Sequence, residues 1–154
     1  MKKENIIKSV LSVVILSIIV IATVIFFVYQ KKWIGIFFIA LGILHLFVLS
    51  FFNIKIKTVW PDVVFGAIDN GFFVIGALIG ADFAGVIGAI VGGAAANAIT
   101  DGFAGLFEGW TAEYLRKHKI EEKRTALSSA LGKMAGCFFG AGIVLIIAWT
   151  IFYL

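Results

Sequence analysis

Long apolar runs separated by short polar joints form a regular pattern along this chain. A helix of about 20 apolar residues is long enough to cross the hydrocarbon core of a bilayer. The pattern therefore predicts an all-α polytopic membrane protein in which residues 1–154 form a single transmembrane domain. About five transmembrane helices are expected, at 9–29, 33–52, 59–81, 83–112 and 126–152.

The first apolar run follows a basic start, as the core of a secretory signal peptide does. The apolar stretch at 9–29 is longer than the roughly 7–15 residues of a signal core, and no A-x-A-like cleavage site follows it before Gln30. We therefore expect this segment to remain as the first span.

Most of the 17 glycines lie in the last three predicted spans. Glycines four residues apart let two helices approach until their backbones touch. We expect these three spans to form a Gly-rich three-helix core, with the first two as a peripheral N-terminal helix pair that faces lipid. The glycine ridges are Gly76 with Gly80, Gly88 with Gly92, and Gly132 with Gly136 and Gly140.

The composition supports a membrane protein and excludes several classes of function. Hydrophobic residues make up 62% of the chain, the mean hydropathy is +1.09, and charged residues make up 14%, against about 25% in soluble domains. The net charge of +4 lies in short clusters between apolar runs, so we expect no nucleic-acid partner. The chain has no hydrolase triad, Walker loop, nucleotide fingerprint or CxxC pair, and we do not expect an enzyme.

The distribution of Lys and Arg predicts the orientation of the chain in the membrane. With the N-terminus in the cytoplasm, ten basic residues lie on the cytoplasmic side, Lys31 and Lys32 lie outside, and Lys133 is embedded. Residues 113–125 then form a cytoplasmic basic loop, and the C-terminus lies outside. A prokaryotic cell membrane is the expected location.

Three ionisable residues, Asp69, Asp101 and Lys133, fall near the middle of predicted spans. Each lies nine residues from a tryptophan or arginine that marks the inner interface, which corresponds to a depth of about 13 Å at 1.5 Å per residue. A carboxylate at such a depth costs about 2.5 to 3.5 kcal/mol and is by default a candidate functional site. We expect the three groups to share one level of the membrane.

Further polar residues extend the two acidic positions along their helices. Asp62 precedes Asp69 by seven residues and Glu108 follows Asp101 by seven, which returns to nearly the same helix face about 10 Å along the axis. Carboxylate and amide oxygens are the hard ligands that replace the water around a cation. We predict Asp69 and Asp101 as principal metal ligands, with Asn97, Asp62 and Glu108 as secondary ones.

Two other residues qualify for coupling or counter-charge, and each has a structural alternative. Lys133 is able to pair with one of the two aspartates as an inert buried ion pair. The other carboxylate then has no cationic partner. His45 is either a ligand or proton carrier, or a packed residue bonded to a neighbouring carbonyl. Thr100 adds a neutral oxygen near Asp101.

At these positions the chain resembles the vacuolar iron transporter family. The first motif of that family, G-A-x-D-G, matches residues 66–69, with Asn70 where the family has glycine. A second motif, similar to G-A-x-S-M-A-x-G-E-Y, falls on residues 93–102. The resemblance implies that Asn97 stands for the family's liganding methionine and Asp101 for its glutamate.

The resemblance covers about residues 63–150 and implies a homodimer that moves ferrous iron and manganese out of the cytosol along a path at the subunit interface. The chain differs from the family in three respects. Two helices precede the motif pair, two helices that follow it in the family are missing, and the cytosolic metal-binding helices shrink to residues 113–123. An asparagine in place of the soft methionine favours harder ions such as manganese or magnesium.

The sequence therefore predicts a membrane transporter for a divalent metal cation, of the iron and manganese type, with proton exchange as the candidate coupling. The expected partners are the lipid bilayer, the transported cation and a second copy of the chain in a dimer. No permanently bound cofactor is expected, because the metal is the substrate. Two alternatives remain: a non-transporting scaffold or assembly subunit with structural buried ion pairs, and a transporter of a small organic cation.

Overall fold

The protein is all-helical in a computed structural model, which describes residues 3–27, 31–118 and 125–152. By length and composition all four helices of this part of the chain are able to cross a membrane. The prediction of an all-α integral membrane protein is thus supported. The helices are α1 (Lys3–Phe27), α2 (Lys31–Phe51), α3 (Ile56–His118) and α4 (Ala126–Thr150).

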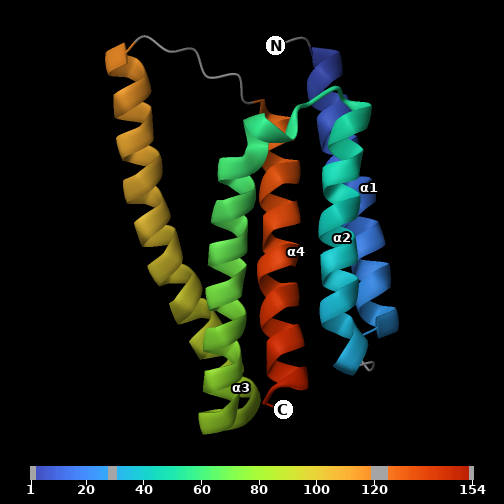
Figure 1. Cartoon of the computed structure of the whole chain (residues 1–154), viewed down its shortest axis with the longest axis vertical. Coiled ribbons are helices and arrows are strands. Elements are labelled where there is room, and N and C mark those ends of the chain that lie inside the picture. Colours follow the sequence, from blue (N-terminus) through green and yellow to red (C-terminus); the bar gives the residue numbers. More distant parts are fainter. Residues whose placement is uncertain (1–2, 28–30, 119–124, 153–154) are drawn as a thin grey trace.

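Helix α3 bends back on itself at Ala84 and Gly85, so that two arms run side by side in opposite directions (Figure 1). Ala84 has non-helical angles, and Gly85 has a φ of +58°, which glycine adopts without the strain that a Cβ atom causes. We call residues 56–83 the first arm and residues 86–118 the second arm.

The bend and the C-terminal end of α3 differ from the sequence-based expectation. A joint between two spans was expected at Asp82, and the bend lies just beyond it, at Gly85. The second arm continues as helix through residues 113–118, so the expectation of a loop was wrong for this part of 113–125. Residues 119–124 of that predicted loop lie outside the described part of the chain.

Glycine pairs hold the two arms of α3 together near the bend. A methyl group on Gly92 would overlap the carbonyl oxygen of Gly76, and one on Gly88 would overlap that of Gly80. Such backbone contact is possible only because all four residues lack a side chain. Toward the other end of the hairpin the arms diverge (Figure 1).

Helix α4 lies between α2 and the first arm of α3 (Figure 1). Its ridge of Gly132, Gly136 and Gly140 packs against the first arm, where methyl groups on the last two would overlap the carbonyl oxygens of Val63 and Ala67. The predicted glycine ridge of the last span therefore serves a contact within the chain.

Helix α2 also belongs to the core, and the prediction of a peripheral N-terminal pair is wrong for it. Its Gly35 packs against the backbone carbonyl of Gly142 on α4, and its His45 and Leu49 are fully buried. Helix α1 is the peripheral one, because Leu16 is its single buried residue among those described. Lacking glycine, α1 has no site for such close backbone contact.

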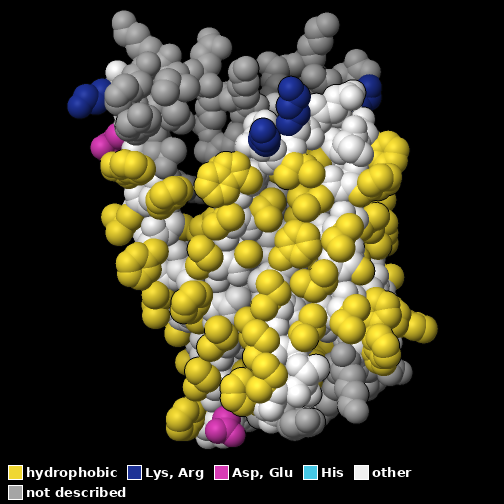
Figure 2. Space-filling view, in the orientation of Figure 1, with side chains coloured by type: hydrophobic (Ala, Val, Ile, Leu, Met, Phe, Trp, Pro, Cys, Tyr) yellow, Lys and Arg dark blue, Asp and Glu magenta, His cyan; other side chains and the backbone are white. Residues whose placement is uncertain are grey.

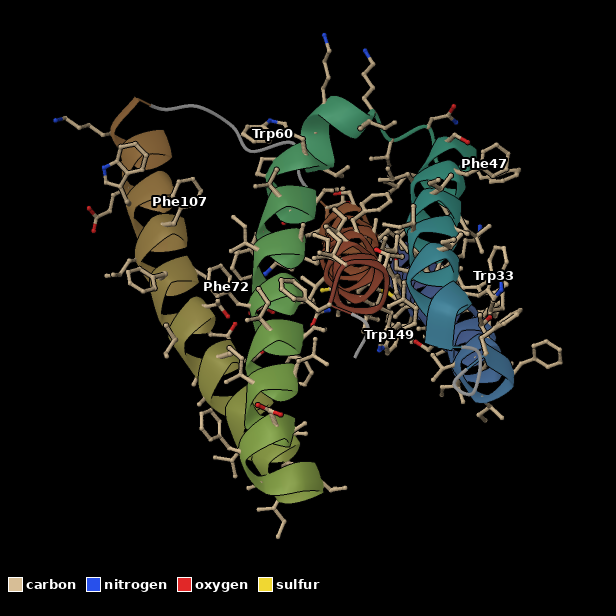
Figure 3. The ribbon with its side chains drawn as sticks, turned by 60° about the horizontal axis from the view of Figure 1, so that its bottom comes forward. Trp33, Phe47, Trp60, Phe72, Phe107 and Trp149 are labelled. Atoms are coloured by element: carbon tan, nitrogen blue, oxygen red, sulfur yellow. The ribbon has the colours of Figure 1, made fainter. Side chains whose placement is uncertain are left out.

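Polar and basic groups mark the two ends of the bundle, with an apolar band between them. The start of α1, the α2–α3 joint, the end of the second arm and the start of α4 lie at one end (Figure 1). Lys side chains gather there (Figure 2), and we call it the basic end. Trp60 lies toward the basic end, and Trp33 and Trp149 lie toward the other (Figure 3).

Candidate functional site

The candidate site lies where the two arms of α3 meet, about midway along the hairpin. The hydroxyl of Thr100 on the second arm donates a hydrogen bond to Asp69 Oδ1 on the first arm. Thr100 is buried, at 7% exposure, and Asp69 is half-buried. Both residues lie roughly 23 Å along their arms from the bend at 1.5 Å per residue. The Gly76–Gly92 contact sets the register that brings them together.

Asp101 is on the outer side of the second arm and is exposed. Successive residues of a helix are about 100° apart, so the step from Thr100 to Asp101 turns this carboxylate away from the first arm. Its Oδ2 accepts a hydrogen bond of 2.8 Å from the amide of Asn97. Within one chain the structure thus brings Asp69 to Thr100 and Asp101 to Asn97.

Asp62 occupies a different contact, between the first arm and α4. Its side chain is buried, at 2% exposure, and Ser129 Oγ donates to its Oδ1 at 2.8 Å. This carboxylate therefore joins two helices at the basic end. Glu108 belongs to the second arm, and its side chain lies outside the described residues.

Lys133 lies on the side of α4 that faces the first arm. Its Nζ is 5.0 Å from the centre of the Phe65 ring, a distance typical of a cation–π contact. The preceding residue, Gly132, packs against Asp62. The carbonyl oxygen of Lys133 faces Gly66, so Lys133 lies beside the part of the first arm between Asp62 and Asp69.

Helix α4 adds a polar group to the wall of the site. The thiol of Cys137 forms a hydrogen bond with the side chain of Asn70 on the first arm. Neither Cys137 nor Thr100 was among the ligands predicted from the sequence. The register of the glycine pairs, taken together with the 100° step, is the signal that identifies Thr100.

His45 lies on the other side of α4, in the contact between α2 and α4. Its ring is 5.2 Å from that of Phe138, and its Nδ1 is 2.8 Å from the carbonyl oxygen of Leu41. An Nδ1–H tautomer donates to this oxygen, while Nε2 has no hydrogen-bond partner among the described residues. These contacts fit a packed histidine bonded to a neighbouring carbonyl.

Among the residues that the structure describes, no group of three or more His, Cys, Asp or Glu side chains is arranged to hold a metal ion. The site instead presents two pairs of oxygen-bearing side chains, Asp69 with Thr100 and Asp101 with Asn97. Hard divalent cations take about six oxygen ligands. A bound cation would need further oxygens, from water or from a second chain.

Comparisons with models of protein families, with curated proteins and with solved structures found no match to this chain.

Proposed function

We propose that the protein is a homodimeric membrane transporter for a hard divalent cation, with Asp69 and Asp101 as its principal ligands. The exposure of Asp101 on the second arm is the observation that carries this proposal. A carboxylate facing hydrocarbon costs about 2.5 to 3.5 kcal/mol, so this face needs a polar cover. A second copy related by a twofold axis brings its own Asp101 and Asn97 to the same place.

The proposed topology has five crossings, because each arm of α3 exceeds the roughly 20 residues that a crossing requires. The apolar part of α3 runs from Ile56 to Phe107, which is too long for one crossing. The basic end faces the cytoplasm of a prokaryotic cell, in agreement with the rule that Lys and Arg collect on that side. The N-terminus is then cytoplasmic and the C-terminus is outside.

The surroundings of Asp101 support a subunit interface on the second arm. At 100° per residue, Ala94, Ala98 and Gly105 lie within about 60° of Asp101 around this helix, and all three are exposed. Small residues let a second helix approach closely inside a membrane, so that its polar groups are able to reach a carboxylate on this face. The same arrangement against lipid would leave the carboxylate and its asparagine partner in hydrocarbon.

The resemblance to the vacuolar iron transporter family supports the same proposal. Its two motifs fall on the two arms of α3, at residues 66–69 and 93–102. These are the segments that the bond between Asp69 and Thr100 connects. A path between two copies of the hairpin would place both motifs beside the transported ion. Proton exchange remains the coupling that we propose.

Cysteine cross-linking tests the interface. In a Cys137→Ala background, the Gly105→Cys variant is expected to form a disulfide-linked dimer in membranes under mild oxidation, because Gly105 is exposed one turn from Asp101 on the same helix face and a side chain there meets no atom of its own chain within 4 Å. Ile25→Cys on α1 is a matched control, since Ile25 is 67% exposed and would face lipid. Absence of a dimer with both Gly105→Cys and Ala98→Cys would contradict the proposed interface.

Transport itself is measured as Mn²⁺ entry into proteoliposomes that contain the full chain. Entry is expected to exceed that into protein-free vesicles, and equal rates would contradict the proposal.

The scaffold alternative has one specific observation in its favour, the buried contact between Asp62 and Ser129, in which a carboxylate holds two helices together. Under that alternative the acids contribute stability and the vesicles take up no cation.

A further inference from the structure

The hydroxyl of Thr100 has one proton and three acceptors within reach. Its Oγ1 contacts Asp69 Oδ1 on the first arm, and it lies 3.0 Å from the carbonyl oxygen of Asn97 and 3.2 Å from that of Ala96 on its own helix. A threonine hydroxyl donates one hydrogen bond at a time and offers its lone pairs to other partners. The proton therefore points either across the hairpin or back along its own helix.

The charge near Asp69 decides between these two positions. An ionised carboxylate is a stronger acceptor than a backbone carbonyl, so without a cation the proton points toward Asp69. A cation held by Asp69 reverses this preference, because the positive end of the O–H dipole would face a positive ion. The proton then turns to the carbonyl of Asn97, and the lone pairs of the hydroxyl face the cation.

From this geometry we infer that Thr100 is a switchable ligand for a hard divalent cation held by Asp69, an inference that rests on the proposed transport function. In the empty site its hydroxyl joins the two arms by donating to the carboxylate. In the loaded site the cation joins them, bound by the carboxylate of Asp69 and the hydroxyl oxygen of Thr100.

Two features of Thr100 suit it to this exchange. Hydrogen bonds from a helical threonine to a carbonyl three or four residues earlier are common, so the second proton position is an ordinary one. Thr100 is also buried, which limits replacement of its hydroxyl by water. A hydroxyl and a carboxylate are hard ligands, so this pair favours Mn²⁺ over a soft ion such as Cd²⁺.

Titration of the full chain with Mn²⁺ and with Cd²⁺, followed by thermal unfolding, tests this role. Thr100→Ser keeps the hydroxyl, and we expect its apparent Kd for Mn²⁺ to stay within about threefold of wild type. Thr100→Val keeps the shape and lacks the hydroxyl, and we expect its Kd for Mn²⁺ to rise about tenfold or more. The Kd of the same variant for Cd²⁺ should rise by a clearly smaller factor. Thr100→Ala carries the same expectation and serves if the Val variant does not fold.

The outcomes separate this inference from the function on which it rests. If the apparent Kd of the Thr100→Val variant for Mn²⁺ stays within threefold of the wild-type value, the role of Thr100 is overturned. The proposed transport function is not affected by that result. Equal weakening of Mn²⁺ and Cd²⁺ binding also overturns the role of Thr100, because a purely structural threonine affects both ions alike. A wild-type chain that responds to neither ion and carries no flux overturns both proposals.

Discussion

Asp69→Asn is expected to lower Mn²⁺ flux in proteoliposomes by about 100-fold or more while the helical bundle stays folded. Asparagine has the same shape, and its Oδ1 is still able to accept the hydrogen bond from Thr100. The substitution removes the negative charge that compensates the cation for its lost water. Initial rates measured with equal amounts of reconstituted protein would show the difference.

Asp82→Asn is the matched control, because Asp82 is an exposed aspartate on the same helix, beside the bend. It should retain nearly wild-type flux, whereas Asp101→Asn should lose flux as Asp69→Asn does. Wild-type flux in the Asp69→Asn variant would show that this residue does not bind the transported ion. If the wild-type chain carries no flux and both Asp69→Asn and Asp101→Asn unfold at lower temperature, the scaffold interpretation is correct.

Gly66→Ala is expected to destabilise the bundle by about 1 to 3 kcal/mol, the usual cost of overpacking. Its new methyl group would overlap the carbonyl oxygen of Lys133 and lie 2.9 Å from the backbone nitrogen of Cys137. These are backbone atoms of α4, which cannot rotate away as the end of a side chain does. The midpoint of thermal or denaturant unfolding in detergent measures this loss.

Gly71→Ala provides a close comparison, because Gly71 is also buried on the first arm and faces α4. The nearest atoms to its added methyl group are 3.9 Å away, an ordinary van der Waals distance. Alanine is also favoured over glycine in a helix by about 1 kcal/mol, so this variant should be neutral or more stable than wild type. Equal losses of stability at the two positions would contradict the packing of α3 on α4.

The helices of this protein are predictable from its sequence because each apolar run is long enough to satisfy its own backbone inside a bilayer. The helical segments predicted at 33–52 and 126–152 differ by at most two residues at each end from α2 and α4. The joint after residue 81 was also expected, although the bend itself uses Gly85, whose missing Cβ atom permits a positive φ. These features depend on local composition alone.

The packing role of α2 was harder to predict, because lipid and protein cores favour the same apolar residues. In a soluble protein a polar face would have marked the outer side of this helix. The available signal was a seven-residue repeat of Gly35, Gly42 and Leu49 along one face. These residues lie against α4 or in the buried core, while exposed residues such as Ile43 are equally apolar.

The partners of the two central acids depend on the rotation of the second arm about its own axis. Sequence spacing places Asp69 and Asp101 at similar depth, but it does not fix which residue of the second arm faces the first. The glycine contacts set that rotation, and Thr100 then takes the position beside Asp69. Rotation of the second arm about its axis by one residue position, about 100°, would have exchanged the roles of Thr100 and Asp101.

The sharp bend of α3 also bears on how the chain enters the membrane. Only Ala84 and Gly85 leave the helical conformation, and Asp82 is the single charged residue between 70 and 100. In the proposed topology no polar loop has to be translocated to the far side, since the backbone bonds of both arms are satisfied by their own helices. We therefore expect the ribosome-bound chain to insert α3 as one preformed hairpin, with its two arms entering the bilayer in a single step.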